Sequence, residues 1–299
     1  MVNFQDELKK RTEEINKVIQ SYLPAEEGFA KTMAQAMNYS ILAGGKRLRP
    51  MLILETLRLF GGEEKLAYPF MAAMEMIHTH SLVHDDLPAL DNDDYRRGRL
   101  TTHKVYGEAM GVLSGVALLN YAYEVMLTAF DTADTPDCQA HVIQALKVMS
   151  HKTGLYGMLG GQSVDVENDG KPMSREMIDY IYENKTSALI EASVMTGAIL
   201  GGAAEEETAI VEKAAKNIGL AFQIQDDILD VTGSQEVIGK PVNSDEKNKK
   251  TTYVTLEGLD KAKKDVEQIS AEAIEELGKL PGNNEFLEQL IHMLINRQK

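Results

Sequence analysis

The stretch HDDLPALDNDDYRRG, residues 84–98, places five aspartates within ten positions and follows them with Arg96 and Arg97. Carboxylates packed this closely repel one another, so a fold keeps them together only in water or opposite positive charge. Carboxylate oxygens suit Mg²⁺, which keeps several waters and bridges to phosphate oxygens. An arginine beside such a site can bind the remaining phosphate oxygens through parallel hydrogen bonds. The stretch therefore predicts a magnesium and phosphate site.

A second acidic motif, DDILD (226–230), echoes the first near the end of a long apolar segment. Asp226 and Asp230 are four residues apart and share one face of a helix, with Gln223 one turn earlier. The flanking residues are apolar, and unpaired buried carboxylates would be costly. A solvated acidic face is the alternative, but two such motifs with apolar flanks favour metal binding.

Calcium and zinc are the rival metals. An EF-hand loop needs glycine at its sixth position and a bidentate glutamate at its twelfth, and the segment that begins DNDDYR (91–96) has neither. His80 and His84 are four residues apart with Asp85 adjacent, but no HExxH sequence and no cysteine pair supports zinc. Magnesium remains the predicted metal.

A basic cluster, GGKRLRP (44–50), predicts a second phosphate site that needs no metal. Its paired glycines allow a tight turn, so Lys46, Arg47 and Arg49 are expected to point into one place. The alternative is a charged connector between two helices. Further lysines that could meet phosphate are Lys185 in ENKT (183–186) and Lys240 in GKP (239–241).

Composition bounds the class of protein. The formal net charge of −15 argues against nucleic acid as a partner, because phosphate binding needs a basic face. With 43% hydrophobic and 26% charged residues, the 299-residue chain can bury a large core. The single cysteine, Cys138, excludes an internal disulfide, and the charged N-terminus does not read as a signal peptide. A cytoplasmic location is therefore expected.

Helices are predicted to position these residues, since apolar residues recur at helical spacing nearly throughout and no stretch alternates as a strand does. Gly44-Gly45 and Gly61-Gly62 are expected to end helices, and Pro50 and Pro69 to open the next ones. The pattern predicts further helices near 104–131, 138–153, 174–202, 206–231, 259–278 and 284–297. We expect one all-α domain over residues 1–299, a large single bundle around a central cavity.

The most apolar stretch, MGVLSGVALLNYAYEVMLTAF (110–130), is long enough to span a membrane. Asn120 and Glu124 lie near its middle, where polar groups are costly in lipid. The stretch is therefore predicted to be a buried core helix, and no stable membrane insertion is expected.

In its motifs and their order, the chain resembles the trans-isoprenyl diphosphate synthases, and among them the bacterial farnesyl diphosphate synthases. Pro88 and Ala89, inserted between Asp86 and Asp91, resemble the insertion typical of short-chain bacterial members. The resemblance implies the isoprenoid synthase fold. The resemblance runs over nearly the whole chain, and the shared stretches are, in order, GGKRLRP, IHTHSLVHDDLPALDNDDYRRG (77–98), GMLGGQSVD (157–165), KTSALI (185–190), FQIQDDILD (222–230) and GKP.

The resemblance implies that the two aspartate motifs face each other across the cavity and hold three Mg²⁺ ions on an allylic diphosphate. The implied metal ligands are Asp85, Asp86 and Asp91, then Asp226 directly, and Asp227 and Asp230 directly or through water. The residues implied around the allylic diphosphate are Arg96, Lys185, Thr186, Gln223 and Lys240, of which the first four are the implied catalytic residues. Those implied around isopentenyl diphosphate are Lys46, Arg49, His78 and Arg97.

The implied reaction joins isopentenyl diphosphate head-to-tail to dimethylallyl or geranyl diphosphate, through ionisation, condensation and loss of a proton. The implied main product is farnesyl diphosphate, with a geranylgeranyl diphosphate synthase as the alternative. His80 replaces the aromatic residue expected five positions before the first aspartate. His80 and Ser81 are therefore implied to form the cavity floor that sets product length. The resemblance also implies a homodimer.

Two departures from the family pattern and two other functions stay open. Val116 stands where aspartate is usual, and Asn243 where glycine is common. A class I terpene cyclase shares an aspartate motif, but it needs serine or threonine at Asp230 and has no use for GGKRLRP. A catalytically inactive subunit of a heteromeric synthase is the other alternative, but such subunits usually lose an aspartate motif.

Overall fold

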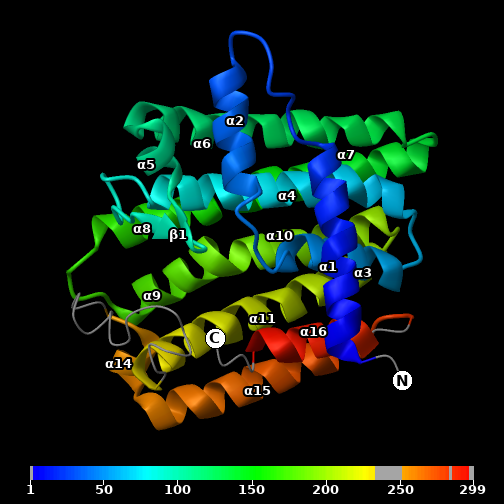
Figure 1. Cartoon of the computed structure of the whole chain (residues 1–299). Helices are drawn as coiled ribbons and strands as arrows, with labels where there is room; N and C mark the ends of the chain where they lie inside the picture. Colours follow the sequence, from blue (N-terminus) through cyan, green and yellow to red (C-terminus); the bar gives the residue numbers. More distant parts are fainter. Residues whose placement is uncertain (1–2, 233–250, 283–284, 296–299) are drawn as a thin grey trace.

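The computed structural model (Figure 1) describes residues 3–232, 251–282 and 285–295 and is almost entirely helical there. This confirms the predicted all-α class. A short antiparallel hairpin, β1 with β2, follows the first aspartate motif. The first half of the chain contains α1 (Phe4–Ser21), α2 (Lys31–Ile41), α3 (Leu48–Leu59), α4 (Glu64–Asp85), β1 (Tyr95–Arg96), β2 (Arg99–Leu100), α5 (Thr102–Tyr106), α6 (Glu108–Leu127) and the 3₁₀-helix η1 (Thr128–Asp131).

The second half of the chain departs from the predicted helices at three places, one of which is the short helix α14 (Tyr253–Glu257), which was not predicted. The single helix predicted over 174–202 is divided at a π-helix, η2. Helix α8 was not predicted, because its sequence MLGGQSVDVE mixes glycine and polar residues without an apolar period. The elements are α7 (Pro136–Thr153), α8 (Met158–Glu167), α9 (Arg175–Ile181), η2 (Tyr182–Ser187), α10 (Ala188–Leu200), α11 (Glu205–Thr232), α14 (Tyr253–Glu257), α15 (Leu259–Leu277) and α16 (Glu285–Ile295).

Helix α10 lies at the centre of the bundle, and each of its residues is buried. It packs on α3, α7 and α11, and α3 in turn packs on α4. In Figure 1, α4 and α6 lie on one side of α10, and α11 and α15 lie on the other. The helices that carry the two aspartate motifs, α4 and α11, are therefore held against opposite sides of one buried helix.

Glycine permits the close contacts of this central helix. A Cβ atom on Gly197 of α10 would lie 2.3 Å from the backbone oxygen of Ile53 in α3. A Cβ atom on Gly219 of α11 would lie 2.3 Å from Ser187 Oγ in η2. Both distances are far inside van der Waals contact, so a larger residue at either position would have to move a helix.

The start of α4 differs from the prediction. Pro69 was expected to open this helix, but α4 begins at Glu64 and contains Pro69 in its second turn. A proline this close to the N-terminus removes only the bond to the carbonyl of Lys65. The apolar run from Leu66 onward, which packs into the core, extends the helix past that loss.

The prediction of a core helix over 110–130 is only partly right. Helix α6 buries Ser114, Gly115 and Leu118 against α4, but Leu113 and Val116 are more than half exposed. By length and apolar composition alone, α6 with η1 is the one helix in the described part of the chain that could cross a membrane. Hydropathy could not distinguish the two faces, since both are apolar.

Replacing Gly197 with alanine is expected to destabilise the fold. Its Cβ would meet the backbone of α3, and overpacking of this kind costs about 1–3 kcal/mol. The control is Gly278→Ala at the end of α15, where φ is −64° and the nearest atom would lie at an ordinary 3.4 Å. Thermal denaturation should show a lower Tm for Gly197→Ala and an unchanged or higher Tm for Gly278→Ala. Equal Tm values would contradict the close-packing argument.

Candidate active site

A cavity of about 250 Å³ opens between α4, α8, η2 and the start of α10. Its apolar wall comes from Leu82, Leu90, Met158, Leu159 and Leu189. Residues predicted from the basic cluster GGKRLRP, from ENKT (183–186), from the first aspartate motif and from the chain-length positions meet in this cavity. The predicted residues that line it are Arg49, His78, His80, Ser81, Asp85, Lys185 and Thr186.

The first aspartate motif begins where α4 ends, and its carboxylates face different partners. Asp85 is the last residue of α4, and its Oδ1 accepts a hydrogen bond from Gln162 Nε2 at 2.7 Å. Asp86 is buried, and its Oδ1 lies 2.7 Å from Arg96 Nε and 2.6 Å from Arg96 Nη2. Asp91 is exposed, and its backbone N–H donates to the Asp85 carbonyl at 2.9 Å. Of these three predicted ligands, Asp85 alone lines the cavity.

The charge of Asp85 is costly in the folded chain. Burial raises the pKa of Asp85, and the nearby Asp91 and Asp86 contribute in the same direction. Against the lowering effect of Lys185, the resulting pKa is about 6. Because this pKa lies above the value of about 4 for an unfolded aspartate, ionised Asp85 destabilises the fold as the pH rises between these values. A cation bound at Asp85 would offset this cost.

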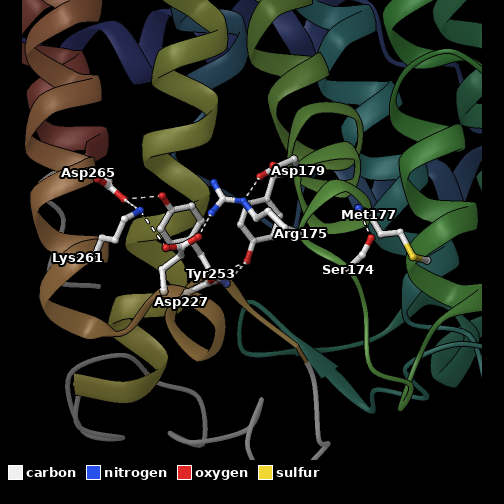
Figure 2. A network of polar contacts seen from close by, with 10 residues as sticks. Ser174, Arg175, Met177, Asp179, Asp227, Tyr253, Lys261 and Asp265 are labelled. Carbon is white, nitrogen blue, oxygen red and sulfur yellow. Dashed lines mark hydrogen bonds and ion pairs between the residues drawn. The ribbon is translucent and has the colours of Figure 1, made fainter.

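The second aspartate motif lies on α11, and its middle carboxylate faces α14. Asp227 is 5% exposed and accepts hydrogen bonds from the Tyr253 backbone N–H at 2.8 Å and from the Tyr182 hydroxyl. Figure 2 shows Asp227 beside Tyr253, whose own hydroxyl donates to Asp265. Asp226 and Asp230 are half-buried on the neighbouring face. Asp227 thus ties α11 to α14.

The donor set fits Mg²⁺ without forming a complete cage. Among the described residues, no three acidic, histidine or cysteine side chains converge as a ready metal site. His78, His80 and His84 also line the cavity, but the Asp85 carboxylate offers the oxygen ligands that Mg²⁺ prefers. Mg²⁺ usually binds proteins through one or two carboxylates and takes its other oxygens from water and substrate phosphate. The residues therefore fit Mg²⁺ that arrives with a phosphorylated substrate.

Three of the residues implied at the isopentenyl diphosphate site lie close together. Arg49 and His78 line the cavity. Arg97 donates through Nη1 to the Gly44 carbonyl, so it reaches the basic cluster from the hairpin. Burial, followed by the guanidinium groups of Arg49 and Arg97, holds the pKa of His78 well below its ordinary value. A neutral imidazole beside two guanidinium groups can donate a hydrogen bond to an anion without adding to their repulsion. Lys46 is exposed in the same loop.

The expectation that Arg47 points with Lys46 and Arg49 is wrong. Arg47 adopts a left-handed backbone conformation, with φ at 51°. Its side chain is buried, forms an ion pair with Glu75 of α4, and donates to Asn16 Oδ1 at 2.9 Å. Arg47 therefore fastens the basic loop to the bundle.

The π-helix η2 presents Lys185 and Thr186 to the cavity. Lys185 Nζ lies 2.5 Å from Asp165 Oδ2 of α8. A Cβ on Gly161 of α8 would lie 2.2 Å from the Lys185 backbone nitrogen, so the two segments pack in direct backbone contact. π-helices are rare and often occur at functional sites. Gln223 is half-buried on α11, and the predicted Lys240 lies outside the described residues, as does Asn243.

Two polar residues at this site, Gln162 and Asp165, had no predicted role. They lie in GMLGGQSVD, which the sequence marked as a shared stretch but whose side chains could not be directed without the position of α8. Their partners, Asp85 and Lys185, are both predicted site residues.

The chain-length positions lie on the cavity wall formed by α4. His80 is 3% exposed, and its Nδ1 lies 2.9 Å from the Gly115 carbonyl of α6. Burial and the adjacent His84 lower the pKa of His80 to about 4, so its ring is neutral at pH 7. Ser81 donates to the His78 carbonyl at 2.9 Å. Val116, which replaces the usual aspartate, is 53% exposed on the outer face of α6 and does not line the cavity.

Comparisons with known proteins agree with this geometry. The polyprenyl synthetase family model matches residues 30–292. A farnesyl diphosphate synthase of Geobacillus stearothermophilus is 43% identical over 256 residues, 86% of this chain and 85% of that protein. The large subunit 1 of a heterodimeric geranylgeranyl pyrophosphate synthase of Arabidopsis thaliana is 41% identical over 278 residues, 92% of this chain and 74% of that protein. The crystal structure of an FPP/GFPP synthase from Zymomonas mobilis superposes with a TM-score of 0.86 at 31% identity and covers 98% of this chain and 99% of its own.

The match extends over most of the chain, and it includes the segments that supply the cavity residues of α3, α4, α8 and η2. It confirms the family predicted from the order of the motifs and, with the structural likeness, the all-α isoprenoid synthase fold. The chain belongs to the polyprenyl synthetase family, and its enzymatic activity is prenyl transfer.

Proposed function

We propose that this chain condenses isopentenyl diphosphate with dimethylallyl or geranyl diphosphate and releases mainly farnesyl diphosphate. The observation that carries the proposal is the single cavity that holds Asp85 and Lys185 together with Arg49 and His78. Two anionic groups can bind there, one through Mg²⁺ and an ammonium group, the other through guanidinium and imidazole groups. The relatives named farnesyl diphosphate synthase support the product, and geranylgeranyl diphosphate is the alternative.

Ionisation of the allylic substrate requires positive charge around its departing diphosphate. When bound, Mg²⁺ stabilises the negative charge that grows there. We propose three ions, held by Asp85, Asp86, Asp91, Asp226, Asp227 and Asp230. The Lys185 ammonium, steadied by Asp165, donates to the departing group. Arg96 keeps further N–H donors beyond its pair with Asp86, and Lys240 is proposed to complete the charge.

Condensation requires a second diphosphate held still. Arg49, His78, Arg97 and Lys46 are proposed to bind isopentenyl diphosphate, so that its double bond lies near the allylic carbon. Thr186 and Gln223 are proposed to line the reacting carbons. The apolar wall that includes Leu159 and Leu189 keeps water from the allylic cation. The last proton leaves for the departed diphosphate, so no protein base is assigned.

A homodimer is proposed from the outer face of α6. Val112, Leu113 and Val116 form an exposed apolar stripe there, with 46%, 52% and 53% of their surfaces in water. A second copy of this chain can cover the stripe with its own, as a two-fold axis allows. A cytoplasmic location is also proposed. It is supported by the single cysteine, Cys138, which cannot form a disulfide within the chain, because disulfides are rare in cytosolic proteins.

The test of function is direct incubation of the purified chain with Mg²⁺, isopentenyl diphosphate and each allylic primer. We expect farnesyl diphosphate as the main product. Asp85→Asn should lower kcat by about 10²–10³-fold, because it removes a ligand of the Mg²⁺ that stabilises transition-state charge. Asp94→Asn, at an exposed pair with Lys104, is the control and should keep activity. Hydrocarbon release from farnesyl diphosphate alone would show a cyclase, and inactivity of the pure chain would show a dependent subunit.

The same variant tests the cost of the Asp85 charge. Without Mg²⁺ at pH 7, Asp85→Asn should unfold at a higher temperature than the wild type, because the wild-type carboxyl is ionised above its raised pKa. The difference in Tm should shrink as the pH falls from 7 to about 4, where the carboxylate is protonated. A gap that widens in acid would mean that the Asp85 charge stabilises the fold.

Product length is expected to depend on His80. His80→Ala should enlarge the cavity next to α4 and shift products from farnesyl toward geranylgeranyl diphosphate. His80→Tyr should add bulk and restrict the products to farnesyl diphosphate. His141→Ala, on α7 outside the cavity lining, is the control. Chromatography of the dephosphorylated products measures the chain lengths. Identical chain lengths in the wild type and all three variants would show that His80 does not form the cavity floor.

The proposed dimer is tested by its apolar stripe. Leu113→Asp should convert a dimer of about twice the 33.1 kDa chain mass into a monomer, because an unpaired carboxylate would be buried in the interface. Leu256→Asp, at another exposed apolar position on α14, should leave the mass unchanged. Sedimentation equilibrium measures both, and a wild-type monomer at micromolar concentration would refute the dimer.

A further inference from the structure

Helix α8 carries two polar side chains, one helical turn apart, that contact both halves of the diphosphate-binding machinery. Gln162 contacts Asp85 at the end of α4, and Asp165 contacts Lys185 in η2. The two partners are 100 residues apart in the sequence. The three-residue spacing of Gln162 and Asp165 places them on neighbouring positions of one helix face. A single rigid element therefore touches both groups.

The contact with Asp85 constrains a carboxylate that would otherwise rotate at a helix end. Gln162 Nε2 donates to Asp85 Oδ1 at 2.7 Å, and the amide must present its nitrogen because an ionised carboxylate only accepts. Groups that donate to a metal-binding carboxylate set its orientation, and their loss typically costs about 10–100-fold in metal affinity or activity. Gln162 also lines the cavity itself.

The contact with Lys185 constrains a flexible ammonium group. Asp165 Oδ2 lies 2.5 Å from Lys185 Nζ, and the Asp165 side chain is only 10% exposed. A lysine carries three donors on a long stem, so one fixed contact restricts its position and leaves two donors for phosphate oxygens. A lysine without this contact would lose more side-chain entropy when it meets the substrate.

The close packing of the α8 backbone on η2 fixes the positions of Gln162 and Asp165 relative to Lys185. A Cβ on Gly161 would lie 2.2 Å from the Lys185 nitrogen and 2.8 Å from the Asn184 carbonyl carbon. Helix α8 therefore lies directly on the backbone of η2, next to the side chain that Asp165 holds. Packing this close does not allow α8 to slide without separating from η2.

We propose that Gln162 and Asp165 are positioning residues that hold Asp85 and Lys185 at one separation, so that carboxylate-bound Mg²⁺ and the ammonium group meet the same diphosphate. The inference rests on the proposed function, because it assigns both partners to the allylic diphosphate. In this proposal, α8 sets the distance between the end of α4, which carries Asp85, and η2, which carries Lys185. Neither residue touches the reacting carbons in this account.

The experiment replaces each residue and measures both binding and turnover in the full chain. Gln162→Met keeps the volume and removes the donor, and Asp165→Asn keeps the shape and removes the charge. The matched controls lie far from the cavity: Gln268→Met removes a donor to Glu272, 3.0 Å away, and Glu276→Gln removes a 12%-exposed carboxylate paired with Lys213 at 2.6 Å. Calorimetry with Mg²⁺ and inorganic pyrophosphate measures affinity without turnover. Thermal denaturation reports folding.

Both site variants should weaken Mg²⁺–pyrophosphate binding by about 10–100-fold. Gln162→Met should raise the Mg²⁺ concentration for half-maximal rate, and Asp165→Asn should lower kcat, while KM for isopentenyl diphosphate stays within about twofold in each. The controls should match the wild type in every measurement except Tm. Equal rises in both substrate KM values, or pyrophosphate affinity that is unchanged in the site variants, would overturn the positioning role. A wild-type chain that makes no prenyl product would instead overturn the proposed function, and the calorimetry would still report on α8.

Discussion

Charge buried in an apolar bundle is the constraint on which the rest of this site depends. A carboxylate taken out of water costs several kcal/mol unless donors or cations surround it. Here the buried carboxylates take their donors from other elements: Asp85 from α8, Asp86 from the hairpin, and Asp227 from η2 and α14. Because these partners come from different elements, the geometry of the site follows from how α4, α8 and α11 pack around η2 and α10.

The residue types at the site could be predicted from the sequence, but the directions of their side chains could not. Asp85, Arg49 and Lys185 share one cavity as expected, because motif chemistry constrains which groups must meet. Neighbours in the same motifs face elsewhere. Arg47 turns into the core at a left-handed backbone angle, and the C-cap residue Asp86 meets the hairpin just after α4 ends. One change of backbone angle redirects a side chain, and no residue pattern records that angle.

The helices themselves were predictable to the extent that each buries one apolar face. That rule identified α7, α11 and α15 from spacing alone. It failed at α8, whose sequence has no apolar period and whose glycines pack directly on neighbouring backbone. It failed differently at α6, where apolar residues occupy the core face and the outer face alike. Apolar composition indicates how much surface is favourably removed from water. It does not specify whether that surface is buried in the protein core, by a partner protein or in lipid.

The overall charge of the chain adds a last requirement. At −15, the molecule as a whole repels diphosphates, so attraction must be local. Arg49 and Arg97 gather at one end of the site, near His78, whose suppressed pKa keeps it from adding a third positive charge. At the other end, Asp85 and its neighbours are acidic, and Lys185 together with bound metal ions would reverse that sign. The two ends therefore differ in the source of their positive charge, and this difference supports the proposal that one cavity binds two diphosphates in distinct places.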